Sequence, residues 1–227
     1  MEQHERTVRL IGPDALQKLQ NSIVAVAGLG GVGGHCAEAL ARAGVGKLHL
    51  VDSDTVNITN LNRQFVATKH TLGWKKTDAM QERLSDVSDC VVTCSDAFIT
   101  PETVSAALPE NADFVVDAID TLSGKLALVQ FAFARGIPII CSMGAGNRLD
   151  PSRFSVKDVF ETSGDPLARR MRQELRKLGV TALPVVVSDE PPHVEKGQTL
   201  IGSLAPVTAS AGLCLAGYVI RELIGQK

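Results

Sequence analysis

Residues 26–33 read VAGLGGVG, and this glycine-rich stretch constrains the fold more than any other part of the chain. Gly28, Gly30 and Gly33 match the pattern G-x-G-x-x-G, after an apolar run and before the helix-like stretch GHCAEALARAG. A strand that turns sharply into a helix needs glycine where φ is positive and where helix and strand pack closely. The free N–H groups at the start of such a helix attract an anion. The stretch therefore predicts a βαβ unit with an anion-binding loop.

An acidic residue follows at the spacing that a nucleotide site requires. Asp52 comes 19 residues after Gly33, at the end of a second apolar run, KLHLVD. This is about the distance at which a carboxylate meets a ribose hydroxyl. A structural βαβ turn would account for the glycines alone. The strand, loop, helix, second strand and terminal acid together favour a nucleotide site.

The rest of the chain alternates between strand and helix patterns. Strands are expected over 23–27, 47–51, 90–96, 114–120 and 137–143, and helices from Pro13 onward and over 33–43, 75–86, 101–108 and 123–135. This order predicts an α/β, Rossmann-like fold with a mostly parallel sheet and helices on both of its faces. After about residue 150, runs 153–159 and 183–190 are expected to add antiparallel strands at one side. We expect a single domain, 1–227.

Composition excludes several classes of protein. A formal net charge of −2, with 44% hydrophobic and 21% charged residues, is ordinary for a globular protein and gives no global sign of nucleic-acid or membrane binding. The charged start, MEQHERTVRL, resembles neither a signal peptide nor a presequence. Five scattered cysteines indicate reduced thiols and a cytoplasmic protein.

The stretch 203–220 is long enough to span a membrane, but Pro206, Thr208 and Ser210 dilute its hydrophobicity. Small residues recur along it at helical spacing, namely Ala205, Ala209, Gly212 and Ala216. We therefore expect a helix that packs closely in the core or in a dimer interface, and no membrane span.

The residues after Asp52 distinguish a site for a nucleoside triphosphate from a site for NAD. Asn60 and Arg63 are three apart, and Lys76 follows at the start of the next expected helix. An amide, a forked guanidinium and an ammonium suit a triphosphate better than the pyrophosphate of NAD. The strand 114–120 carries Asp117 and Asp120 towards its carboxyl end, where a carboxylate is well placed for Mg²⁺. Each residue alone could be a surface charge, but together, in this order, they favour a nucleoside triphosphate over NAD.

The stretch DPLARRMRQELRKLG is an amphipathic helix. Asp165 can cap it and Pro166 suits its first turn. Leu167, Met171, Leu175 and Leu178 form its apolar face, while Arg169, Arg172 and Arg176 form another. The arginine face is either a solvated surface or a strip that contacts nucleic-acid phosphates, since one acid stands among five basic residues.

Four motifs, GLGGVG, DSDTVNITNLNRQ, GWKK and DAIDT, resemble the adenylating core of the ubiquitin-activating superfamily, whose bacterial members include the ThiF, MoeB and HesA proteins. The resemblance covers roughly 5–148. It implies that Asp52 holds the ATP ribose, that Asn60, Arg63 and Lys76 hold the phosphates, and that Asp120 holds Mg²⁺. The nucleotide-binding candidates are Gly28, Gly30, Gly31, Gly33, Asp52, Asp54, Asn60, Arg63, Gln64 and Lys76.

The same resemblance implies a homodimer. Arg9, in RTVRLIG, matches the arginine that such dimers insert into the partner's site. The candidate catalytic residues are Arg9, Arg63, Lys76 and Asp120.

The cysteines distinguish branches of this superfamily. Members that activate a carrier protein often hold zinc on two C-x-x-C pairs, and several use a cysteine beyond the adenylation site. This chain has no C-x-x-C, and no cysteine lies between Cys141 and Cys214, so we expect no zinc and no thiol carrier in that region. Cys141 stands beside GAG, where a ligand could reach it. Cys36, Cys90, Cys94 and Cys214 are expected to be buried.

The remainder, about 149–227, resembles the tail of the bacterial tRNA threonylcarbamoyladenosine dehydratases and would serve the substrate and the dimer. In that branch ATP activates the threonyl carboxylate and a nitrogen of the same substituent closes a hydantoin ring, so the tethered nucleophile replaces a thiol intermediate. A tRNA substrate would give the arginine face a role.

Two alternatives stay open. One is an adenylyltransferase of the MoeB/ThiF type acting on a sulfur-carrier protein. The other is a nucleotide-binding scaffold without turnover. Sulfur-transfer or carrier proteins as partners, and a monovalent cation, are also left open by the sequence.

Overall fold

A computed structural model describes residues 2–193 and 200–226. Its strands are β1 (Ile23–Ala27), β2 (Lys47–Val51), β3 (Val91–Ser95), β4 (Phe114–Asp117), β5 (Ile139–Ser142), β6 (Phe154–Asp158) and β7 (Pro184–Ser188). Its α-helices are α1 (Glu5–Ile11), α2 (Pro13–Asn21), α3 (Gly33–Ala43), α4 (Lys76–Ser85), α5 (Val104–Ala107), α6 (Leu122–Arg135), α7 (Pro166–Lys177) and α8 (Ala205–Ile224). Short 3₁₀ turns cover Glu2–His4, Ile58–Asn60, Pro151–Arg153 and Val159–Glu161.

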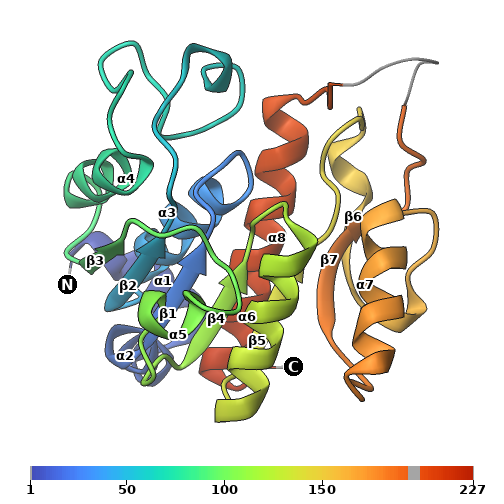
Figure 1. Ribbon diagram of the computed structural model, residues 1–227. Helices are drawn as coiled ribbons and strands as arrows, with labels where there is room; N and C mark the ends of the chain where they lie inside the picture. Colours follow the sequence, from blue (N-terminus) through green and yellow to red (C-terminus); the bar gives the residue numbers. More distant parts are fainter. Residues whose placement is uncertain (1, 194–199, 227) are drawn as a thin grey trace.

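The strands form one sheet in the order β3-β2-β1-β4-β5-β7-β6 (Figure 1). All neighbouring pairs are parallel except β6 and β7. The predicted Rossmann-like sheet and its antiparallel addition are therefore confirmed. The antiparallel strand is β6, because the chain leaves β5 at the carboxyl edge of the sheet and runs straight back. β7 starts from the opposite edge and runs with β5.

Helices cover both faces of the sheet, as the strand patterns predict. Alternate side chains of β1 point to opposite faces: Val24 and Val26 belong to one apolar cluster, and Ala25 and Ala27 to the other. The first cluster includes side chains of α2, α3, α4 and α8, and the second includes side chains of α5, α6 and α7. Figure 1 shows α6 and α7 in front of the sheet and α8 behind it.

Several boundaries differ from the sequence prediction. The strand expected over 114–120 ends at Asp117, and the helix expected over 101–108 narrows to Val104–Ala107 after a turn. Cys94 is exposed, and Cys90 and Cys214 are partly buried, which corrects the expectation that all of them are buried. Cys90 and Cys94 lie in or beside β3, an edge strand that packs less completely than the centre of the sheet.

The small-residue stretch forms α8 as expected. Gly212 packs so closely on the start of α3 that a Cβ there would lie 2.3 Å from the carbonyl oxygen of Val32. Among the described helices, α8 alone is long and apolar enough to cross a membrane, with a mean hydropathy of 1.4 over its most apolar window. It packs against α3, α2 and three strands, which is typical of a core helix.

Candidate functional site

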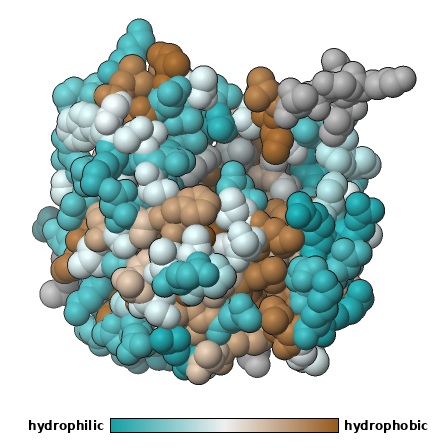
Figure 2. All heavy atoms as spheres, in the orientation of Figure 1, coloured by the Kyte–Doolittle hydropathy of each residue, from teal (hydrophilic) through white to brown (hydrophobic). Residues whose placement is uncertain are grey.

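A cavity of about 540 Å³ opens at the carboxyl ends of β1 to β4. β1 and β4 are neighbours here while their following connections diverge, which is the place where open α/β sheets bind ligands. In the same region, the upper edge of the molecule is indented between two raised groups of side chains (Figure 2). The predicted site residues that line the cavity are Gly28, Gly30, Gly31, Asp52, Asp54, Asn60, Arg63, Gln64, Lys76 and Asp120.

The glycine loop has the geometry that the sequence predicts. Gly28 has φ +90°, and a Cβ there would lie 2.7 Å from the carbonyl oxygen of Ala118. Gly33 does not line the cavity but starts α3, where a Cβ would lie 1.8 Å from the carbonyl oxygen of Gly28. Both positions admit only glycine, so the loop stays close to β4 and α3 points its N-terminus towards the cavity.

Asp52 is held against this loop. Its carboxylate accepts hydrogen bonds from the N–H of Leu29 at 2.6 Å and from the N–H of Asp54 at 2.8 Å. Burial raises the pKa of Asp52, and the nearby ammonium of Lys76 opposes that rise. The carboxylate is therefore fixed in place beside the loop at the end of β2.

Lys76 begins α4 and is buried, with its Nζ atom 2.7 Å from a carboxylate oxygen of Asp54 and 3.7 Å from one of Asp52. An ammonium held at the wall of a cavity by partly exposed carboxylates can also meet a phosphate oxygen. The structure thus places the predicted cation where a ligand's anionic group would enter.

The Asn–Arg loop, residues 57–65, forms the next part of the wall. Asn60 accepts a hydrogen bond from the N–H of Asn57 at 2.9 Å and so completes a capping box with Asn57, the N-cap of the 3₁₀ turn. Arg63 donates only within its own loop, to Thr59 and Asn62, and it forms no ion pair with any described residue. The amide oxygen of Gln64 is buried without a hydrogen-bond partner among the described residues. Arg63 and Gln64 therefore keep hydrogen-bonding capacity for a ligand.

The two acids after β4 have different environments. Asp117 is completely buried and pairs with the equally buried Lys125, at 3.0 Å. Asp120 is exposed and lines the cavity. The strand-end residue Asp117 thus has a structural partner, whereas Asp120, in the turn after β4, forms no ion pair with a described residue and faces the cavity.

Four predicted residues lie away from this cavity. Arg9 is exposed on α1 and pairs with Glu5 at 2.5 Å. On α7, Arg169 is exposed, Arg172 donates to the hydroxyl of Thr162, and the Arg176 guanidinium lies 5.4 Å from the Phe160 ring centre. The arginine face is therefore partly engaged within the protein.

Cys141 is completely buried on β5, so the expectation that a ligand could reach it is wrong. Burial first, and the nearby carboxylate of Asp117 second, hold the pKa of this thiol well above its usual value. A thiol in such a position is not a nucleophile at neutral pH.

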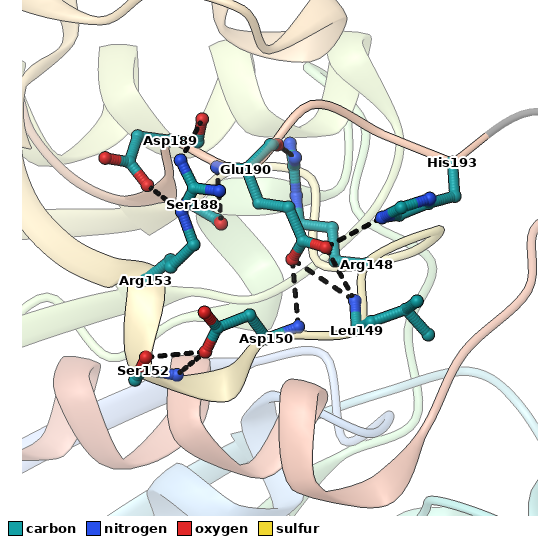
Figure 3. Close-up of polar contacts among 9 residues, drawn as sticks. All are labelled: Arg148, Leu149, Asp150, Ser152, Arg153, Ser188, Asp189, Glu190 and His193. Atoms are coloured by element: carbon teal, nitrogen blue, oxygen red, sulfur yellow. Dashed lines mark hydrogen bonds and ion pairs between the residues drawn. The ribbon is translucent and has the colours of Figure 1, made fainter.

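A polar cluster that the sequence patterns did not predict joins the loops after β5 and β7 (Figure 3). The buried carboxylate of Glu190 accepts hydrogen bonds from the N–H groups of Leu149 and Asp150 and lies 2.9 Å from the Nε2 atom of His193. Arg148 donates to the carbonyl oxygen of Glu190 and pairs with Asp165 at 2.8 Å, with both side chains buried. The only sequence signal is Arg148 in the stretch GAGNRLDP, a charged residue that, once buried, requires hydrogen-bond and ion-pair partners.

Asp165 performs the predicted capping of α7, since its carboxylate accepts a hydrogen bond from the N–H of Ala168 at 2.7 Å. The same side chain meets Arg148. The cluster therefore ties the start of α7 to the carboxyl edge of the sheet.

Comparisons with known proteins agree with this geometry. The sequence model of the ThiF family matches residues 3–227. The tRNA threonylcarbamoyladenosine dehydratase of Bacillus subtilis is 40% identical over 242 residues, covering 99% of this chain and 95% of the relative. The Escherichia coli protein of the same name is 40% identical over 248 residues, covering 97% and 92%. A crystal structure of that protein in complex with ATP superposes with a TM-score of 0.93 at 34% identity, covering 99% of this chain and 94% of the other.

Proposed function

This chain belongs to the ThiF family, and we propose that it is an ATP-dependent tRNA threonylcarbamoyladenosine dehydratase, which converts the modified adenosine into its cyclic hydantoin form. One observation carries the proposal. The cavity at the end of β1 to β4 gathers a glycine loop, Asp52, Arg63 and Lys76, and the same fold in a similar protein binds ATP.

In the proposed reaction, these groups bind ATP and the threonyl carboxylate reacts with it. Asp52 holds the ribose, Asn60 donates a hydrogen bond to the phosphates, and Arg63 and Lys76 neutralise their charge. The threonyl carboxylate attacks the α-phosphorus and pyrophosphate leaves. A nitrogen of the same substituent then attacks the acyl carbon, loses its proton, and AMP leaves. The nucleophile is already tethered, so no thiol is needed.

Asp120 fits a magnesium ion that accompanies ATP. Mg²⁺ is usually bound by one or two carboxylates together with substrate phosphates, and Asp120 is an exposed carboxylate at the cavity wall. When bound, the ion would neutralise charge on the phosphates.

The alternative of a MoeB/ThiF-like adenylyltransferase for a carrier protein has less support. The chain has no C-x-x-C pair, and its Cys141 is buried with a raised pKa. The set of Arg63, Lys76 and Asp120 at one cavity favours an enzyme over a nucleotide-binding scaffold without turnover. Sulfur-transfer proteins and a monovalent cation are not part of the proposal.

The first test is mass spectrometry of nucleosides from tRNA incubated with the protein, ATP and magnesium. We expect a loss of one water from threonylcarbamoyladenosine that requires ATP. Calorimetry should show binding of ATP with magnesium and none of NAD. An unchanged nucleoside together with acylation of a carrier protein would favour the alternative, and comparable NAD affinity would overturn the assignment of the cavity.

We also propose a cytoplasmic homodimer in which the part around 5–148 binds the nucleotide and the part around 149–227 serves the substrate and the dimer. Arg9 would enter the partner's cavity, which is consistent with its exposed position on α1 and its weak surface pair with Glu5. Arg169, Arg172 and Arg176 would contact tRNA phosphates.

Arg9→Ala and Asp120→Ala proteins, each inactive alone, are expected to regain part of the activity when mixed. A mixed dimer would contain one intact site with Arg9 from one protomer and Asp120 from the other. The measurement is the dehydration rate after subunit exchange has been verified by labelled protomers. If exchange occurs and activity stays absent, Arg9 does not act across the dimer.

A further inference from the structure

The three segments that carry the phosphate-binding candidates also contact one another through side chains that do not line the cavity. α3 follows the glycine loop, α4 begins with Lys76, and the Asn–Arg loop contains Arg63 and Gln64. One cluster of four side chains, which we call the aromatic clamp, joins them: His35 and Glu38 on α3, Arg83 on α4, and Phe65 in the loop.

The contacts of the clamp are close. The Arg83 guanidinium lies 3.9 Å from the centre of the Phe65 ring, and the His35 ring packs against the same ring at 4.7 Å with an interplanar angle of 60°. Phe65 is therefore in contact with a side chain from each of the two helices. Stacking of a guanidinium on an aromatic ring and edge-to-face packing are both favourable arrangements.

Each end of the clamp is fixed. Arg83 pairs with Glu38, whose side chain is 7% exposed and also pairs with Arg42 at 2.7 Å. At the other end, the Nδ1 atom of His35 lies 2.7 Å from the carbonyl oxygen of Gly31. That oxygen can only accept, so Nδ1 carries the proton. The clamp thus runs from a buried carboxylate to the glycine loop itself.

The Asn–Arg loop needs such a support. Arg63 bonds only to Thr59 and Asn62 of its own loop, and the amide oxygen of Gln64 has no partner among the described residues. Their orientation is therefore set by the backbone that carries them. Val66 anchors the end of this backbone in the core, while Phe65 fixes it against α3 and α4.

We propose that Phe65 and Arg83 are positioning residues, which hold the Asn–Arg loop so that Arg63 meets the phosphates of the nucleotide and the Gln64 amide faces its other polar groups. This rests on the proposed function of the cavity as an ATP site. Neither residue lines the cavity, so their effect reaches the ligand through the loop.

The protein offers a matched control. Arg135 on α6 also stacks on a phenylalanine, Phe131 at 4.1 Å, and also pairs with a glutamate, Glu110 at 3.0 Å. Neither Arg135 nor Phe131 lines the cavity. Arg83→Met and Arg135→Met therefore each remove a guanidinium–ring contact and an ion pair with a glutamate, buried in the case of Glu38 and exposed in the case of Glu110, and only Arg83 contacts the phosphate-binding loop.

We expect Arg83→Met to weaken ATP binding about tenfold, through KM more than kcat, and Arg135→Met to leave it unchanged. Phe65→Ala should weaken ATP binding similarly. Phe65→Tyr should bind ATP as the wild type does, because the aromatic ring is kept. Calorimetry with ATP and magnesium measures the affinity, and the thermal midpoint measures the loss of stability.

Equal affinities in the Arg83→Met and Arg135→Met proteins would overturn the inference, as would a Phe65→Tyr protein that binds as weakly as Phe65→Ala. If Arg83→Met does not fold, the two Phe65 variants decide. Failure of the wild-type protein to bind ATP would refute the proposed function instead. The two failures are therefore distinguishable.

Discussion

Replacing Arg63 with alanine is expected to lower the rate of ATP-dependent tRNA dehydration by about 10²–10³-fold and to leave the fold intact. Arg63 lines the cavity and has no ion pair with a described residue, so its removal breaks only two hydrogen bonds to its own loop. The loss falls on ligand binding and turnover, because the phosphate charge would lose a forked hydrogen-bond donor.

Arg63→Lys tests the geometry of this contact. The ammonium keeps the charge but cannot donate two parallel hydrogen bonds, so a partial loss of rate is expected. Initial rates at saturating tRNA measure the effect, and thermal midpoints within a few degrees of the wild type show that folding is unchanged. An Arg63→Ala protein that keeps most of its activity would remove Arg63 from the phosphate site.

Local sequence patterns were sufficient for most of the fold. The alternation of apolar runs and amphipathic segments predicted the parallel sheet because each βαβ unit is specified within about 30 residues. The exceptions arise where tertiary contacts decide. β4 stops at Asp117 because the chain turns there towards the cavity, and Cys94 is exposed because β3 became the edge of the sheet.

The candidate site likewise contains residues that local sequence predicts and contacts that only the tertiary structure determines. Gly28, Asp52 and Lys76 lie at carboxyl ends of strands or starts of helices, where spacing along the chain determines position in space. The pairing of Glu38 with Arg83, 45 residues apart, and of Arg148 with Glu190, 42 apart, depends on which helices and loops become neighbours. A charge pattern in the sequence cannot reveal that choice. None of these four residues lines the cavity, so a search for ligand-binding motifs does not find them either.

The buried pair below the cavity shows how strongly such a contact can matter. Lys125 on α6 donates to both carboxylate oxygens of Asp117, at 3.1 and 3.0 Å, and to the carbonyl oxygen of Ser142 at 2.7 Å. Both side chains are fully buried. Lys125 therefore joins α6 to the ends of β4 and β5, directly before the turn that carries Asp120.

Replacing Lys125 with methionine is expected to lower the free energy of unfolding by about 3–5 kcal/mol, because it leaves the Asp117 carboxylate buried without its cation. That is a large part of the stability of a typical domain, about 5–15 kcal/mol. Denaturant unfolding at neutral pH measures the change. The control is Lys177→Met, which removes an exposed pair with Glu174 and should cost at most about 1 kcal/mol.

The double variant Asp117→Asn/Lys125→Met separates charge from packing. Asparagine is neutral and can still accept the hydrogen bond that the N–H of Ile119 gives to Asp117. Without a buried unpaired charge, the double variant should recover a substantial part of the lost stability, since the penalty in the single variant comes mainly from that charge. A double variant no more stable than Lys125→Met would mean that the buried charge is not the main cost, and that the loss comes from the missing bond of Lys125 to Ser142 and from packing.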